Sequence, residues 1–123
     1  MTLGYWMILV AGILPYFAVG VSKWRPDYDN SAPRAGVERL GARQQRAYWA
    51  QLNGFEAFPL FAAAVIIAHL AGAPQTWIDG LALAFVLLRA VYTVLYIYDK
   101  PTPRSLVWVA AMACIVGLFV AAV

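Results

Sequence analysis

The sequence predicts an all-α integral membrane protein, a four-helix bundle in a single domain of residues 1–123. Of its residues, 63% are hydrophobic and only 12% are charged, whereas soluble domains are about half apolar and about a quarter charged. A domain of this size buries the smallest share of its surface, so one core cannot hide this many apolar side chains. The composition argues against a soluble enzyme and excludes a disordered chain.

The apolar residues fall into four stretches, each close to the roughly 20 residues that cross a bilayer as a helix. The expected spans are residues 2–21, 43–70, 76–98 and 105–123. Span one carries no charge, lacks a basic start and has too long an apolar run for a signal peptide, so we expect it to be retained. Span two is uncharged only from Ala57 onward, span three contains Asp79 and Arg89, and span four is uncharged.

Basic residues are unevenly shared among the three connections. The first contains Lys23, Arg25, Arg34 and Arg39. The second, AGAPQ, has no basic residue, and the third, DKPTPR, has Lys100 and Arg104. The positive-inside rule then predicts that the first and third connections are cytoplasmic and that both termini face outward. Pro101 and Pro103 are expected in the third connection, where they end span three and precede span four.

The single cysteine and the single histidine limit the chemistry. Cys114 alone cannot form a disulfide framework or a cysteine-based zinc site, and a single histidine, His69, argues against a histidine-rich metal centre, so no metal site is expected. Cys114 lies in an apolar span, and we interpret it as a packing residue. We interpret His69 as interfacial, and Asp79 as a carboxylate suited to the N-terminus of its own helix.

Polar residues form a stripe on each of the two central spans. At 100° per residue, Arg46, Asn53 and Glu56 fall within an arc of about 80° on span two. On span three, one face carries Arg89, Tyr92, Tyr96 and Asp99. The two stripes are expected to face each other or a neighbouring subunit. They either hold the helices together, for example through a Glu56–Arg89 pair, or form a ligand site. Ionisable residues at membrane depth are found in both roles.

The order and spacing of these residues resemble the MAPEG family, the membrane-associated proteins in eicosanoid and glutathione metabolism. The run Arg46-x6-Asn53-x2-Glu56-x2-Pro59 resembles the family signature. ERLGARQQRA resembles the end of the first cytoplasmic loop, and FPLFAAAVIIAHLAGA the rest of the second span. LLRAVYTVLYIYDKPTPRS resembles the third span and the turn into the fourth. The resemblance covers most of the chain and is closest to bacterial members similar to microsomal glutathione transferase.

The resemblance implies a homotrimer in the bacterial inner membrane. Glutathione, as co-substrate, would lie between subunits near the cytoplasmic face, and a hydrophobic electrophile or lipid would enter from the bilayer. The activity implied is that of a glutathione transferase or peroxidase. No nucleic-acid partner is expected, because the basic residues lie where the membrane topology requires them. The resemblance assigns glutathione binding to Arg46, Gln51, Asn53, Glu56, Arg89 and Tyr92. It assigns catalysis to Arg104, Ser105 and Tyr96.

These residue types suit that chemistry. Arginine binds carboxylates through a fixed fork of donors, and Lys23 or Arg25 could assist. A cation such as Arg104 favours the thiolate, the reactive form, and a thiol pKa lowered by one to two units corresponds to about 1.4 to 3 kcal/mol.

The sequence also departs from the family pattern. Trp49 stands where several catalytic relatives have arginine, and Ala57 where some have tyrosine. Two alternatives to the enzyme are therefore kept: a non-catalytic lipid- or ligand-binding member, and an accessory subunit of a larger membrane complex. A dispensable Arg104 with retained lipid binding favours the first, and stable co-purification with a different chain favours the second.

Overall fold

The computed structural model describes residues 1–24, 28–33 and 40–123. In these ranges the chain forms helices and connections without any strand, so the predicted all-helical fold is confirmed. The helices are α1 (Leu3–Ser22), α2 (Ala42–Leu70), α3 (Gln75–Ile97) and α4 (Pro101–Ala121). Each is long and apolar enough to cross a membrane.

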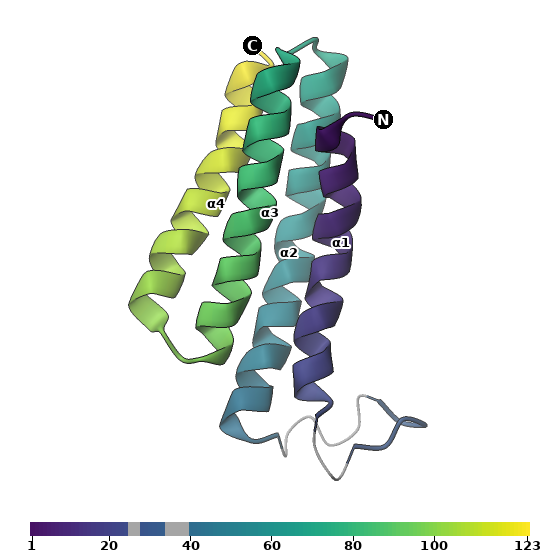
Figure 1. Ribbon diagram of the computed structural model, residues 1–123, viewed down its shortest axis with the longest axis vertical. Coiled ribbons are helices and arrows are strands. Elements are labelled where there is room, and N and C mark those ends of the chain that lie inside the picture. The colour runs from purple at the N-terminus through teal and green to yellow at the C-terminus, as the bar shows by residue number, and fades with distance from the viewer. Residues whose placement is uncertain (25–27, 34–39) are drawn as a thin grey trace.

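The helices run up and down beside one another (Figure 1). α2 and α3 form the centre, since each contacts the other three helices, and α1 and α4 pack on either side. Both termini lie at the same end as the α2–α3 turn, which we name the terminal end (Figure 1). The opposite end, where α1 and α3 end and α2 and α4 begin, is named the basic end. Arg25, Arg34 and Arg39 lie outside the described residues.

The core is built from rings and small side chains. Phe61 of α2 stacks on Phe85 of α3 with ring centroids 4.0 Å apart, and both rings are buried. Alanines that are fully buried allow close helix approach; they include Ala64, Ala68, Ala82 and Ala111. Cys114 is 9% exposed and belongs to this core, which agrees with a packing role.

Two helix ends differ from expectation at the basic end. α4 begins at Pro101, four residues before the expected residue 105, so Pro101 and Pro103 lie in its first turn rather than in a loop. Proline fits there because the first N–H groups of a helix need no partner inside it. Asp99 has a φ of 58° and follows the end of α3. It therefore does not continue the helical face of Arg89, Tyr92 and Tyr96, as the stripe predicted.

At the terminal end, His69 of α2 joins the start of α1. Its Nδ1 lies 2.7 Å from the carbonyl oxygen of Val65, and its Nε2 lies 2.7 Å from Thr2 Oγ1. A carbonyl only accepts, so Nδ1 donates to Val65, and Nε2 shares a hydrogen bond with the Thr2 hydroxyl. The Tyr5 ring stacks on the His69 ring at 3.8 Å between centroids. His69 is thus a bonded link between helices.

Asp79 completes this end from α3. Its Oδ1 accepts from the backbone N–H of Gly4 at 2.8 Å and from Gln75 Nε2 at 2.8 Å. We expected the carboxylate to serve the N-terminus of its own helix, but it also satisfies an N–H in the first turn of α1. The first four N–H groups of a helix lack internal partners and favour a negative charge, which explains the attachment.

Candidate functional site

A groove opens at the basic end between α2, α3 and α4. It consists of two hollows of about 460 and about 220 Å³ that share Tyr92 and Tyr96. The larger hollow is otherwise lined by Trp49, Leu52, Asn53 and Glu56 of α2. The smaller one is otherwise lined by Arg104, Ser105, Trp108 and Val109 of α4. The groove therefore brings together all three residues expected to be catalytic and three of the six expected to bind glutathione.

Two tyrosines in contact with each other, each with an arginine over its ring, form a row of four side chains behind and beside the groove. Tyr92 and Tyr96, one helical turn apart on α3, meet edge to face with centroids 5.7 Å apart. The Arg89 guanidinium lies 4.2 Å from the Tyr92 centroid, and the Arg104 guanidinium 4.3 Å from the Tyr96 centroid. A ring face attracts a cation by about 0.5 to 2 kcal/mol. The Tyr96 ring therefore holds Arg104 at the groove.

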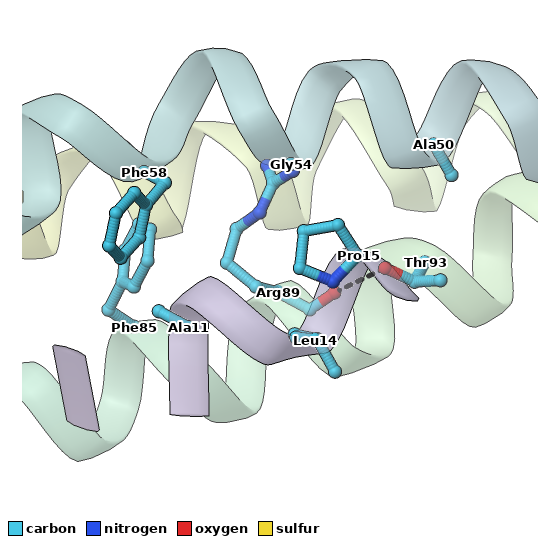
Figure 2. Close-up of a pocket in the computed structure, with 9 residues that line it drawn as sticks. All are labelled: Ala11, Leu14, Pro15, Ala50, Gly54, Phe58, Phe85, Arg89 and Thr93. Atoms are coloured by element: carbon cyan, nitrogen blue, oxygen red, sulfur yellow. Dashed lines mark hydrogen bonds between the residues drawn. The ribbon is translucent and has the colours of Figure 1, made fainter. Parts of the chain in front are cut away.

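Arg89 lies behind the groove rather than in its lining. It is 4% exposed, and its Nη2 donates to Asn53 Oδ1 at 2.7 Å. Its Nη1 is buried and has no hydrogen-bond partner among the described residues. Figure 2 shows the side chain between α1, α2 and α3, close to Pro15 and Gly54. Arg89 can therefore act on a ligand only through the groups that it holds.

The contact between Arg89 and Asn53 confirms that the polar faces of α2 and α3 meet. The Glu56–Arg89 pair considered as a link between the helices does not form here, because Arg89 bonds to the Asn53 amide and the exposed Glu56 lines the groove. Because Asn53 Oδ1 accepts from Arg89, the amide nitrogen remains to donate toward the groove. Glu56 likewise keeps a carboxylate available at the surface.

Arg46 has a different role at the end of α3. Its Nε donates to the carbonyl oxygen of Ile97 at 3.0 Å. The last carbonyls of a helix lack internal donors, and a basic side chain commonly satisfies them. Arg46 therefore joins α2 to the end of α3 and is not part of the groove lining, and Gln51 is also outside it. Of the assisting cations, Lys23 lies 5.5 Å from the Tyr28 ring centroid, and Arg25 is not among the described residues.

The groove lining also contains residues that were not expected to be part of the site. They are Trp49, Leu52, Trp108 and Val109. A periodic signal was present for two of them: Trp49 lies on the stripe of Arg46, Asn53 and Glu56, and Trp108 follows Arg104 by one turn.

The MAPEG family model matches residues 3–123, essentially the whole chain. The chain belongs to the MAPEG family. The resemblance seen in the sequence is thereby confirmed. Searches of curated proteins and of solved structures found no match. Family membership makes this a membrane protein related to glutathione or eicosanoid metabolism, in agreement with its four apolar helices.

The groove of this MAPEG chain is amphiphilic. It presents a guanidinium from Arg104, an amide nitrogen from Asn53 and a carboxylate from Glu56. Hydroxyl groups come from Ser105 and from Tyr96, while Leu52, Trp108 and Val109 supply apolar surface. Such a set can bind a small molecule with charges of both signs beside an apolar one. Among the described residues, no group of three or more His, Cys, Asp or Glu is placed to hold a metal.

Proposed function

We propose that this MAPEG protein is a glutathione-dependent membrane transferase or peroxidase that activates the glutathione thiolate. The observation that carries the proposal is the position of Arg104. Its guanidinium is held over Tyr96, next to Ser105, in a groove that reaches Asn53 and Glu56. A fixed cation, neighbouring hydroxyls and a polar cleft are what binding and ionising a thiol peptide require.

Glutathione carries a thiol, two carboxylates and an amine, and the groove offers a counterpart for each kind of group. Glu56 receives the amine, while the amide nitrogen of Asn53 and the Tyr92 hydroxyl donate to carboxylate or peptide oxygens. Arg89 orients Asn53 from behind. Arg46 holds the end of α3, which carries Tyr96. In this proposal Arg89 and Arg46 are positioning residues.

Gln51 supports a site shared between subunits. It points about 160° away from Asn53 around α2, so one chain cannot bring both residues to the same ligand. A neighbouring copy can present its Gln51 to the groove of the first, as in the homotrimer that the family resemblance implies. Glutathione would then lie between two subunits.

The reaction begins with the thiolate, whose charge Arg104 favours and to which Ser105 and Tyr96 donate hydrogen bonds. In conjugation, the sulfur forms a bond to an electrophilic carbon and the leaving group departs with its electron pair. In peroxide reduction, the sulfur attacks the terminal peroxide oxygen, which yields an alcohol and a sulfenic acid. A second glutathione converts the sulfenic acid to the disulfide and water. Apolar co-substrates reach the sulfur along Leu52, Trp108 and Val109.

The charge distribution supports an inner-membrane orientation with the basic end in the cytoplasm. Of the nine Lys and Arg residues, all except Arg89 lie in residues 23–46 or 100–104. Basic residues accumulate on the cytoplasmic side of spans. Cytoplasmic glutathione would then reach the groove directly, while lipid substrates arrive through the bilayer.

The test is conjugation of glutathione to 1-chloro-2,4-dinitrobenzene by the detergent-purified protein. Arg104→Ala is expected to lower the rate at neutral pH by about tenfold or more, since a pKa change of one unit is about 1.4 kcal/mol. Raising the pH should restore part of that rate, because solution then forms the thiolate. Lys100→Ala, an exposed basic residue outside the groove lining, is the matched control. No turnover together with no thermal shift on adding glutathione contradicts the proposal.

Trp49 favours a second candidate, a lipid- or ligand-binding member without catalysis. Its indole lines the groove where several catalytic relatives carry a cation, and it is 47% exposed. This makes one wall more apolar than a peptide carboxylate prefers. Binding of a fluorescent fatty acid that survives Arg104→Ala and needs no glutathione would support this candidate over the enzyme.

A further inference from the structure

A separate hollow of about 500 Å³ opens at the basic end between α1, α2 and α3. We name it the α1 hollow. Its lining is Val21 and Trp24, Arg43 and Gln44, and Val94, Ile97 and Tyr98. It shares no residue with the groove. α1 and α4 pack on either side of the central pair, so the hollow beside α1 is distinct from the groove beside α4.

The α1 hollow has a basic aromatic mouth. The Arg43 guanidinium lies 5.1 Å from the Tyr98 ring centroid. Gln44 Nε2 donates to the carbonyl oxygen of Trp24 at 3.3 Å and so ties the rim of α2 to the end of α1. Among the described lining residues there is one cation and no carboxylate. An anion would therefore meet an attractive charge with no opposing one in the lining.

The rest of the lining is aliphatic. Val21 lies in the last turn of α1, and Val94 and Ile97 lie in the last turn of α3. Arg43 is in the first turn of α2, and Tyr98 directly follows α3. Ile97 is level with Tyr98, whereas Val94 lies one turn before Tyr98 and Val21 three residues before Trp24, so two aliphatic side chains lie about 5 Å further in than the rings. A phospholipid presents its phosphate, glycerol and acyl chain in the same order.

The position along the membrane normal also fits a lipid. Trp24 is 83% exposed and Tyr98 is 58% exposed, at helix ends where tryptophan and tyrosine usually mark the headgroup region. The described Lys and Arg residues other than Arg89 gather at this end, and an anionic membrane surface attracts basic residues that lie near it.

We propose that the α1 hollow binds one anionic phospholipid, with its phosphate on Arg43 and an acyl chain along Val21, Val94 and Ile97. A zwitterionic lipid brings no net negative charge to Arg43 and binds more weakly. The site is independent of the proposed activity, because none of its residues lines the groove.

The test uses the full chain in phosphatidylcholine vesicles that contain an equal fraction of either brominated phosphatidylglycerol or brominated phosphatidylcholine. Bromine quenches tryptophan on contact, and subtracting the signal of Trp24→Phe isolates Trp24. We expect several-fold stronger Trp24 quenching by the brominated phosphatidylglycerol. Arg43→Gln should abolish that preference, whereas Lys100→Gln, an exposed basic residue outside the hollow, should keep it.

Three outcomes would overturn the site. The first is equal Trp24 quenching by the two brominated lipids in the unmodified chain. The second is a phosphatidylglycerol preference that survives Arg43→Gln. The third is a Trp24 that neither lipid quenches until subunits are separated, which would make a second copy of the chain the occupant. Arg43 is exposed, so its substitution should not prevent folding.

Discussion

The two ends of the bundle treat their polar side chains differently. At the terminal end, Thr2, His69 and Asp79 bond to one another's helices or to backbone groups. At the basic end, Arg104 contacts a tyrosine ring and Glu56 lies exposed in a groove. Unpaired polar groups are expensive in a bilayer. Groups that can still form hydrogen bonds or ion pairs therefore mark the places where water, a headgroup or a ligand must supply the partner.

The Asn53–Arg89 contact lies between these two cases. Arg89 is buried like the terminal-end network, but it holds a residue of the groove. Changes there should affect both stability and binding, whereas changes at the terminal end should affect stability alone. The following predictions test this difference.

Asn53→Leu is expected to have the largest effect. It leaves Arg89 Nη2 without its acceptor in a buried place, and a buried charged donor without a hydrogen-bond partner costs about 3 kcal/mol. The unfolding midpoint in detergent should fall, and the glutathione-induced thermal shift should disappear. Asn53→Asp, which keeps an acceptor oxygen, should retain most of the stability. Wild-type stability of Asn53→Leu would show that the bond does not hold the bundle.

Asp79→Ala should lower stability by about 1 to 2 kcal/mol, as loss of a helix cap does, because the Gly4 N–H and Gln75 lose their acceptor. Conjugation per folded molecule should not change, since Asp79 lies at the end opposite the groove. Asp79→Asn keeps an acceptor oxygen and serves as the control. A lower turnover number with normal stability would mean that the two ends are coupled.

A pair of glycines should respond in opposite directions to alanine. A Cβ on Gly4 would lie 2.8 Å from Ile78 Cγ2 and 3.1 Å from His69 Cε1, so the closely packed terminal end must shift at a cost of about 1 kcal/mol. A Cβ on Gly80 would meet no described atom within 4 Å, and its higher helix propensity should stabilise by up to about 1 kcal/mol. Thermal unfolding of the two variants decides this, and equal midpoints would argue against close packing at Gly4.

The fold could be predicted because the hydropathy pattern is sufficient for it. Four apolar stretches separated by basic or turn-rich connections allow few other architectures. The start of α4 was missed because prolines look like helix breakers in a sequence. Whether Pro101 ends one helix or begins the next depends on backbone geometry that the residue type does not reveal.

Periodicity could predict which polar residues face one another, but not which atoms bond. Opposite charges made a Glu56–Arg89 pair one of the two alternatives, yet Arg89 bonds to the neutral Asn53. Arg46 bonds to the backbone carbonyl of Ile97, and Asp79 to the N–H of Gly4, 75 positions away. Backbone partners leave no trace in a side-chain pattern, so they appear only once the helices are placed.

The smallest predicted effect comes from adding a cation to the lining of the groove. Trp49→Arg places a guanidinium in the lining beside Asn53 and Glu56, where a glutathione carboxylate could receive its forked donors. Because Trp49 is an exposed residue, stability should change by less than about 0.5 kcal/mol, while KM for glutathione falls several-fold and kcat stays nearly constant. Trp77→Arg, an equally drastic change at the terminal end, should leave KM unchanged. If the KM of Trp49→Arg were unchanged or raised, the glutathione carboxylates would lie elsewhere, and the exposed indole would instead fit an apolar ligand.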